Sequence, residues 1–299
     1  MKKLLTLVSL LGVTAMVLTA CGGGAKGADQ LADIKQRGYI MVSTDPNYEP
    51  QSFLNTEGQR PADTKCPSDT LTTAEMQGFD VDVAAEIGKR LGVETCFATP
   101  SWDIITAGSW ADKWDISVGS MTIYKSRMEV LNFTVPYYYY DAVVATGKDA
   151  TFNSVDDLAG QAVCAAASTT YEAWLNGTAG DNLPAEDIFA QPPANVTVVP
   201  LDTDQECAQA IAAGRTDFVA YVTASTVVAS NIANGLPVKQ IGGAVYRERL
   251  AVAIDKGSSL PTDTLLAKLN EVIEAMHADG TLAQFSTTWF GADLTQPPE

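Results

Sequence analysis

The sequence predicts an α/β protein built from two lobes. The chain has 299 residues, of which 46% are hydrophobic, and this length favours two domains over one. Short apolar strands alternate along it with amphipathic helices. Two stretches also echo each other, because ITAGSWADKWDISVGSM and IAAGRTDFVAYVTAS each pass from a helix end with glycine to an aspartate and an apolar strand. Two lobes built on one plan would produce this repeat.

The first segment is typical of an export signal. MKKLLTLVSLLGVTAMVLTAC places two lysines before an uncharged apolar stretch and ends in LTAC, which resembles the bacterial lipobox. We therefore predict a signal peptide over 1–20, and a lipidated Cys21 followed by a flexible glycine-rich tether over 21–30. The alternative is a membrane anchor helix, since Leu4 to Ala20 is near the lower length limit for spanning. The expected location is the outer face of the cell membrane, in the cell envelope or periplasm.

Composition and motifs exclude several classes of function. A formal net charge of -17 disfavours nucleic acid as a partner, because phosphate binding needs a basic surface. The chain has no cofactor fingerprint, phosphate loop, serine nucleophile motif or metal-ligand cluster. We therefore expect no catalytic residue, no metal and no cofactor. The single histidine, His277, falls in the last turn of a predicted helix and is expected to be structural.

Export permits disulfides between the cysteines that follow Cys21. Cys66, Cys96, Cys164 and Cys207 allow three pairings. We favour Cys66 with Cys96 and Cys164 with Cys207, because each pair then lies in one half of the chain. The other two pairings would link the halves.

The predicted elements follow in order along the chain. A strand over 39–42 leads into the loop STDPNYEP, and a polar inserted loop over 63–73 comes next. GFDVDVAAEIGKRLGVE predicts an amphipathic helix that ends at Gly92, because its apolar residues recur every four positions. Strands are expected at 116–118, 161–167 and 218–222.

Two further helices are expected. Thr169-Thr170-Tyr171-Glu172 has the form of a capping box. TDTLLAKLNEVIEAMHADG predicts an amphipathic helix that stops at Gly280. The run of tyrosines over 137–140 is expected to pack inside a lobe.

These segments resemble the family 3 extracellular solute-binding proteins, the polar amino-acid-binding components of ABC importers. The resemblance includes STDPNYEP, GFDVDVAAEIGKRL, DISVGSMTIYKSRMEVLNFTVPYYY, AASTTYEAWL and ADGTLAQFSTTWFG. It implies a two-lobed periplasmic-binding-protein type II fold, with mixed sheets flanked by helices and the ligand in a cleft that closes on a hinge. The implied lobes are 31–142 plus 250–299 and 143–249, with two crossings near 142–147 and 245–253.

The resemblance also implies a ligand site. Arg127 occupies the position that holds the ligand α-carboxylate, for which a guanidinium offers paired N–H donors. Ser120 and Thr122 match positions that fix the amino-acid head. From the other lobe, Thr169 and Thr170 open a helix whose free N–H groups suit an anion.

Simpler roles stay open for these residues. Arg127 could pair with Glu129 on the surface, and the two threonines could serve only as helix caps. Tyr48 and Trp102 match places where the family sandwiches the ligand side chain, although aromatic residues usually belong to a core.

The family's partner for the ligand ammonium is missing from this sequence. The strand DFVAYV ends in Val222, where amino-acid binders of this kind have an aspartate. Asp45 matches an acidic position in the first-lobe loop, and Glu172 or Glu206 stay open as partners.

A second possibility is a methylated or cyclic cation held by aromatic faces. Tyr48, Trp102 and Tyr221 would supply these faces, which would suit a compatible solute.

The sequence therefore predicts the monomeric substrate-binding component of an ABC importer. It would capture a small zwitterion, most simply a polar amino acid, and deliver it to a membrane permease complex. The alternatives are a compatible-solute binder, a sensory ligand-binding protein, and a cyclohexadienyl-dehydratase-like enzyme that uses Asp45, Glu172 and Arg127.

Overall fold

The computed structural model describes residues 27–297 of the chain. The predicted signal peptide over 1–20 and the predicted lipid site at Cys21 lie outside these residues. Helix α1 begins at Gln30 behind a cap from Asp29, close to the predicted start of the folded part. No helix of the described region is long and apolar enough to cross a bilayer.

Strands and helices alternate along the described residues, as predicted. The strands are β1 (Tyr39–Ser43), β2 (Asn47–Tyr48), β3 (Ser52–Leu54), β4 (Leu71–Thr72), β5 (Met76–Gln77), β6 (Glu94–Ala98), β7 (Ile116–Thr122), β8 (Leu131–Phe133), β9 (Tyr138–Gly147), β10 (Ala162–Ala166), β11 (Thr197–Leu201), β12 (Ala220–Ala224) and β13 (Val238–Asp255). The helices are α1 (Gln30–Arg37), α2 (Phe79–Leu91), α3 (Trp102–Thr106), α4 (Arg127–Val130), α5 (Thr170–Leu175), α6 (Asp204–Ala212), α7 (Ser225–Ala233), α8 (Asp263–Ala278) and α9 (Thr281–Phe290), with short 3₁₀ turns at Asp156–Leu158, Ala179–Asp181 and Ala185–Asp187.

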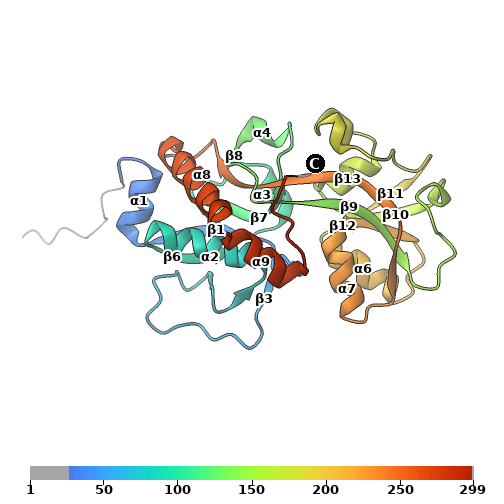
Figure 1. The fold of residues 1–299 in the computed structure, drawn as a ribbon, viewed down its shortest axis with the longest axis horizontal. Helices are drawn as coiled ribbons and strands as arrows, with labels where there is room; N and C mark the ends of the chain where they lie inside the picture. The colour runs from blue at the N-terminus through green and yellow to red at the C-terminus, as the bar shows by residue number, and fades with distance from the viewer. Residues whose placement is uncertain (1–26, 298–299) are drawn as a thin grey trace, which may run out of the picture.

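A mixed sheet runs through the whole described region in the order β11-β10-β12-β9-β13-β7-β1-β6-β4, with β8 beside β13. The pairs of β10 with β11 and β12 and of β1 with β6 and β7 are parallel, and the edge strand β4 pairs antiparallel with β6. Between them, β9 and β13 pair antiparallel with each other. Figure 1 shows these two strands running between a first group of elements around α2 and α8 and a second group around α6 and α7.

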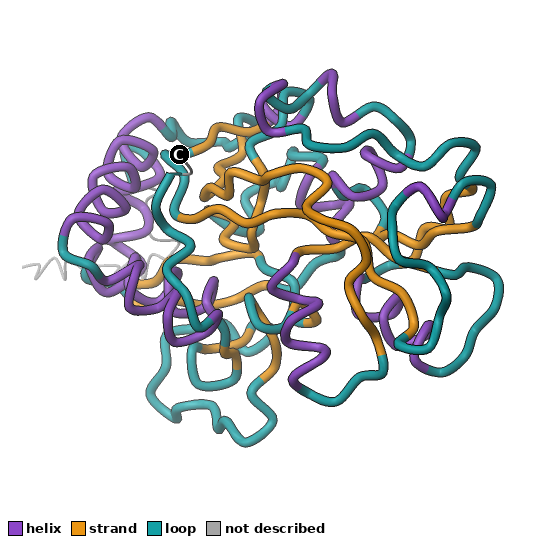
Figure 2. The backbone as a smooth tube through the Cα atoms, turned by 45° about the vertical axis from the view of Figure 1, so that its right-hand side comes forward, coloured by secondary structure: helices purple, strands orange, loops and turns teal. Residues whose placement is uncertain are grey.

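Both faces of the sheet are covered in each group. In the first group, Ile40 and Val42 of β1 pack with α2 and α8, while Met41 packs on the other face with Trp110. In the second group, Val163 of β10 packs on the α5 side and Cys164 on the α6 side. Successive side chains of a strand point to opposite faces of the sheet, and both faces are covered, so the strands are apolar throughout. Figure 2 shows the strands in orange through the middle and the helices of the first group stacked at one end.

Helix α2 has the form predicted from its sequence. Its buried residues include Phe79, Val83, Ile87 and Leu91, and Gly92 ends it in the left-handed conformation with φ 76°. Such an end favours glycine, which carries no Cβ.

The predicted capping box of α5 is only half correct. The Thr169 side chain accepts the Glu172 N–H, as expected, but the Glu172 carboxylate accepts the Ser168 N–H instead of that of Thr169. Ser168 has φ 62°, so the chain turns sharply before the cap and brings a different N–H to the carboxylate. A complete capping box is found at α6, between Thr203 and Glu206.

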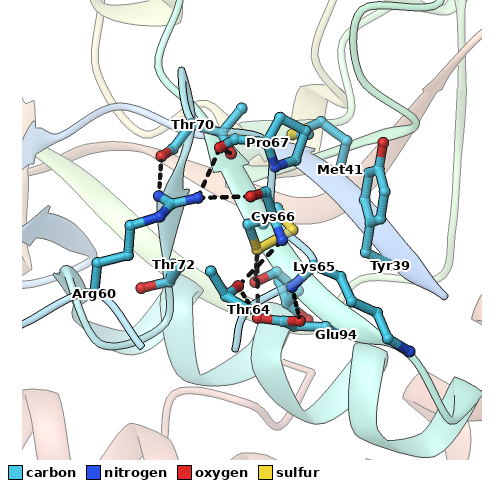
Figure 3. Close-up of a disulfide and its surroundings, with 12 residues drawn as sticks. Tyr39, Met41, Arg60, Thr64, Lys65, Cys66, Pro67, Thr70, Thr72 and Glu94 are labelled. Atoms are coloured by element: carbon cyan, nitrogen blue, oxygen red, sulfur yellow. Dashed lines mark hydrogen bonds between the residues drawn. A yellow bond between two sulfur atoms is a disulfide. The ribbon is translucent and has the colours of Figure 1, made fainter. Parts of the chain in front are cut away.

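The two preferred disulfides are confirmed. Cys66 bonds to Cys96 and Cys164 bonds to Cys207, with Cα atoms 5.4 and 5.9 Å apart. The first bond attaches the inserted polar loop to β6. Figure 3 shows that Arg60 supports the same loop, because its guanidinium donates to the backbone carbonyls of Cys66, Pro67 and Thr70.

Candidate functional site

A cavity lies where the two groups of elements meet, with a volume of about 40 Å³. This is room for roughly three water molecules, at about 10–15 Å³ each on the same measure. Its walls come from both groups, from the long strands and from the loops that follow β1 and β10. The lining residues are Asp45, Tyr48, Trp102, Gly119, Ser120, Thr122, Arg127, Tyr140, Ala166, Thr169, Thr170, Tyr171, Asp202, Asp204 and Glu248.

The structure brings eight of the nine predicted ligand-binding residues to this cavity. They are Asp45, Tyr48, Trp102, Ser120, Thr122, Arg127, Thr169 and Thr170. Tyr221 is the exception, because it is fully buried in a core cluster with Cys164, Cys207 and Phe218. It therefore offers no aromatic face to the cavity.

Arg127 is a buried cation, with 7% of its surface exposed. Its guanidinium donates to the Ser168 carbonyl at 3.1 Å and to the Thr122 carbonyl at 3.5 Å. It lies over the rings of Trp102 and Tyr124, at 5.5 and 5.6 Å from their centroids.

No carboxylate of residues 27–297 forms an ion pair with Arg127, and Glu129 is exposed to solvent. Burial lowers the pKa of Arg127, and the negative charge of Glu248 opposes this effect. The surface pairing considered for Arg127 is therefore not found.

Ser120 is held by a buried network behind the cavity. Its backbone has φ 53°, in the left-handed region where non-glycine residues are strained. Its N–H donates to the Tyr137 hydroxyl at 3.0 Å, and its own hydroxyl donates to Asp80 at 2.7 Å and pairs with Tyr138. Both donors of Ser120 are thus used inside the protein, so it shapes the cavity wall more than it offers free N–H or O–H groups.

Asp80 anchors this network from the first turn of α2. It is fully buried and also accepts the Tyr137 hydroxyl at 2.6 Å. Burial raises the pKa of Asp80 to about 7, although the hydrogen bonds from Ser120 and Tyr137 lower it. Asp80, the first acid of the helix motif, therefore holds Ser120 in the cavity wall. It also lies in the first turn of α2, where an acid suits the helix dipole.

Glu248 is an acid of the cavity that the sequence interpretation missed. It lies on β13 with 1% of its surface exposed. Its Oε1 accepts hydroxyl hydrogen bonds from Thr122 of the first group and from Thr170 of the second, the latter at 2.5 Å. Its Oε2 is buried and has no hydrogen-bond partner in the described region. Burial raises the pKa of Glu248, and the Arg127 charge is among the effects that lower it.

Asp204 is the second missed acid, at the first residue of α6. Its Oδ2 accepts the Thr223 hydroxyl at 2.9 Å, while Oδ1 is buried without a hydrogen-bond partner among the described residues. Burial raises the pKa of Asp204 to about 7, and the negative charges of Asp45 and Glu248 add to the increase. Burial also raises the pKa of Asp45.

The acids left open as ammonium partners have other roles. Glu172 caps the turn before α5 and lines a neighbouring groove that shares Arg127 and Thr169 with the cavity. Glu206 accepts the backbone N–H groups of Asp202 and Thr203 in the capping box of α6.

Three tyrosine hydroxyls meet inside the cavity, and we call Tyr48, Tyr140 and Tyr171 the tyrosine cluster. Tyr48 lies 3.0 Å from Tyr140 and 2.9 Å from Tyr171, and Tyr140 lies 3.0 Å from Tyr171, measured between hydroxyl oxygens. Tyr48 belongs to β2, Tyr140 to β9 and Tyr171 to α5, so the cluster joins both groups of elements. Tyr140 therefore faces the cavity and does not simply fill a lobe core.

A signal for Glu248 was present in the sequence. In YRERL, Tyr246, Glu248 and Leu250 are buried while Arg247 and Arg249 are partly exposed. Strand alternation thus places Glu248 on the apolar face, where an acid is rarely buried unless it has a partner. Asp204 carried no such signal, because an acid in the first turn of a helix is ordinary.

The chain is similar to known proteins in both sequence and fold. The sequence model of the bacterial extracellular solute-binding proteins, family 3, matches residues 40–292. The chain is 29% identical to the L-cystine-binding protein TcyJ of Escherichia coli over 96% of this chain and 97% of the relative. It is 26% identical to the L-cystine-binding protein TcyA of Bacillus subtilis over 99% of each. Its structure is similar to that of an ancestral amino-acid-binding protein, a precursor of cyclohexadienyl dehydratase, with a TM-score of 0.69 and 27% identity over 87% of this chain and 99% of the other.

Proposed function

Because this chain belongs to the bacterial extracellular solute-binding proteins, family 3, we propose that it is the substrate-binding component of an ABC importer for an amino acid. The cavity holds the α-carboxylate of the ligand at Arg127 and its α-ammonium at a buried acid nearby. One observation carries the proposal. Arg127 is a buried guanidinium that contacts only neutral carbonyls and aromatic rings among the described residues, so it can receive an anion.

The ligand closes the two lobes proposed over 31–142 plus 250–299 and over 143–249. The cavity supports this, because Arg127 and Trp102 come from the first group while Thr169 and Tyr171 come from the second. A ligand that contacts both groups only when they are close favours the closed arrangement, since a ligand shifts an equilibrium through its differential affinity. Strands β9 and β13 supply the crossings.

The protein works outside the cell, anchored through the lipid on Cys21 and delivering its ligand as a monomer to a membrane permease. The family is described as extracellular, and one relative, from Haemophilus influenzae, is named a probable amino-acid ABC transporter-binding protein. Metabolic labelling with a radioactive fatty acid tests the anchor. Label that is lost in the Cys21→Ser variant supports it, and equal labelling of both proteins contradicts it.

The protein binds its ligand without chemical turnover. The cystine-binding relatives named above are described as binding proteins, and the structural relative is itself described as amino-acid-binding. Recovery of the bound compound unchanged after long incubation, measured by mass spectrometry, supports binding. Steady conversion would contradict it.

Calorimetric titration of the purified protein tests the proposed function directly. The ligands are the common L-amino acids, the matching α-hydroxy acids that lack the ammonium, and glycine betaine as a compatible solute. We expect at least one amino acid to bind and its α-hydroxy analogue to bind at least tenfold more weakly. Binding of glycine betaine with no binding of any amino acid would overturn the proposal.

A further inference from the structure

The cavity carries more negative charge than a neutral amino acid would balance. Among the described residues its lining has four carboxylates, from Asp45, Asp202, Asp204 and Glu248, and one cation, Arg127. Asp202 is exposed to solvent, so three carboxylates remain that are shielded at least in part. A ligand with one carboxylate and one ammonium adds no net charge. The excess of acids therefore remains after such a ligand binds, and in a buried site unbalanced charge is unfavourable.

Two of these acids are each prepared to receive one more hydrogen-bond donor. Glu248 and Asp204 have 1% and 5% of their surfaces exposed. In each, threonine hydroxyls hold one oxygen, and the other oxygen has no partner among residues 27–297. A buried acceptor without a donor is unfavourable. We therefore expect the ligand to donate hydrogen bonds to Glu248 Oε2 and Asp204 Oδ1.

The two acids stand in different relations to Arg127. Among the charged groups, Glu248 has the largest influence on the pKa of Arg127. The pKa of Asp204 is raised first by burial, and the charges that raise it further are those of Asp45 and Glu248. Glu248 also shares Thr122 with Arg127, since this threonine contributes its hydroxyl to one and its carbonyl to the other. In an amino acid the α-ammonium is adjacent to the α-carboxylate, so Glu248 is placed for the α-ammonium.

We propose that Asp204, together with Asp45, which lines the same cavity, forms a second cation subsite, and that the ligand is an amino acid with a positively charged side chain. This inference rests on the proposed function. Arginine, lysine and ornithine have the required chemistry: one carboxylate for Arg127, an α-ammonium for Glu248 and a side-chain cation for Asp204. A ligand of this class also reduces the charge excess of the cavity, which a neutral amino acid does not.

The tyrosine cluster limits how such a ligand enters. Its three hydroxyls are 2.9–3.0 Å apart in a cavity of about 40 Å³. A basic side chain needs more room, so the hydroxyls must separate when it binds. They then become free to accept hydrogen bonds from the side-chain N–H groups, with the tyrosine rings available to the cation.

The test compares charged ligands with uncharged analogues of similar shape. Calorimetric titration uses arginine against citrulline and lysine against norleucine, with the intact mature protein. We expect arginine or lysine to bind at least tenfold more tightly than its analogue. Asp204→Asn should bring the two members of the pair within about threefold, while Glu248→Gln should weaken both members by a similar factor, because both keep the α-ammonium. Asp217→Asn is the matched control, since Asp217 is exposed and pairs with Arg215 away from the cavity.

Each outcome separates this inference from the proposed function. Equal binding of the two members in both pairs, or tighter binding of cystine, which carries no net charge, would overturn the cationic subsite and leave amino-acid binding intact. A loss in Asp204→Asn that is equal for both members of a pair would also overturn it. Failure of every amino acid to bind would overturn the proposed function first.

Discussion

Replacing Arg127 with alanine tests the proposed carboxylate site most sharply. The substitution removes a guanidinium that is 93% buried, two hydrogen bonds to carbonyls and two aromatic contacts. Truncating one partner of a buried charge pair weakens binding by about 2–5 kcal/mol. At about 1.4 kcal/mol per tenfold change, the dissociation constant should rise roughly 30-fold to several-thousand-fold.

The assay is calorimetric titration with the amino acid that binds the wild-type protein most tightly. Arg127→Lys should fall between wild type and alanine, because it keeps the charge but loses the paired donors. Arg215→Ala is the control, since Arg215 is an exposed arginine paired with Asp217 outside the cavity, and its affinity should match wild type. Thermal melting confirms that each variant is folded at the assay temperature. An unchanged dissociation constant in folded Arg127→Ala would remove the residue from the ligand site.

Three further predictions concern stability. The pKa of Asp80 is about 7 in the folded protein against 3.8 for a free side chain, so the folded state holds this proton more tightly than the unfolded state. The free energy of unfolding should therefore fall as pH rises from about 4 to 7, by about 1.4 kcal/mol per pH unit from this group. Urea unfolding of Asp80→Asn should lack that contribution. Replacing both Cys164 and Cys207, which are 43 positions apart, with serine should reduce the unfolding free energy by about 4 kcal/mol through loop-closure entropy. Thr203→Ala should cost about 1 kcal/mol by removing the cap of α6, seen as a lower melting temperature.

Each stability prediction has a clear contrary result. An identical pH slope in wild type and Asp80→Asn would show that Asp80 titrates normally. Equal urea midpoints for the double serine variant and wild type would show that the second disulfide does not constrain the unfolded chain. For the cap, Thr203→Ser is the control, because serine keeps the hydroxyl; an equal loss in both variants would point to the methyl group instead.

Local patterns predicted much of the fold. The four-residue spacing over 79–91 defined α2, and the even distribution of cysteines between the halves led to both disulfides. The site depended on matching Arg127 and its neighbours to a family motif, and eight of the predicted residues do meet at one cavity. Each of these predictions used either residues that lie close together in the chain or a motif shared with a family.

The missed features depend on contacts between distant segments. Glu248 meets Thr122 and Thr170, which are 126 and 78 positions away, and no sequence pattern of one strand reveals such partners. Tyr221 was predicted to offer an aromatic face to a ligand cation. Its strand β12 is buried at every position, and a strand buried on both faces has no alternation to tell one face from the other. In the structure, Tyr221 and Val222 pack in different core clusters.

The paired strands β9 and β13 restrict how the two groups of elements can move. Their hydrogen bonds match Tyr246 to Ala142 and continue to Leu250 and Tyr138, so sliding one strand along the other would break several bonds at once. Bending or twisting both strands together keeps the ladder intact. The pairing is interrupted between Ile241 and Tyr246, so this stretch can absorb torsion at the lowest cost. Opening and closing should therefore follow a narrow, reproducible path, and amide hydrogen exchange should change most beside that interruption.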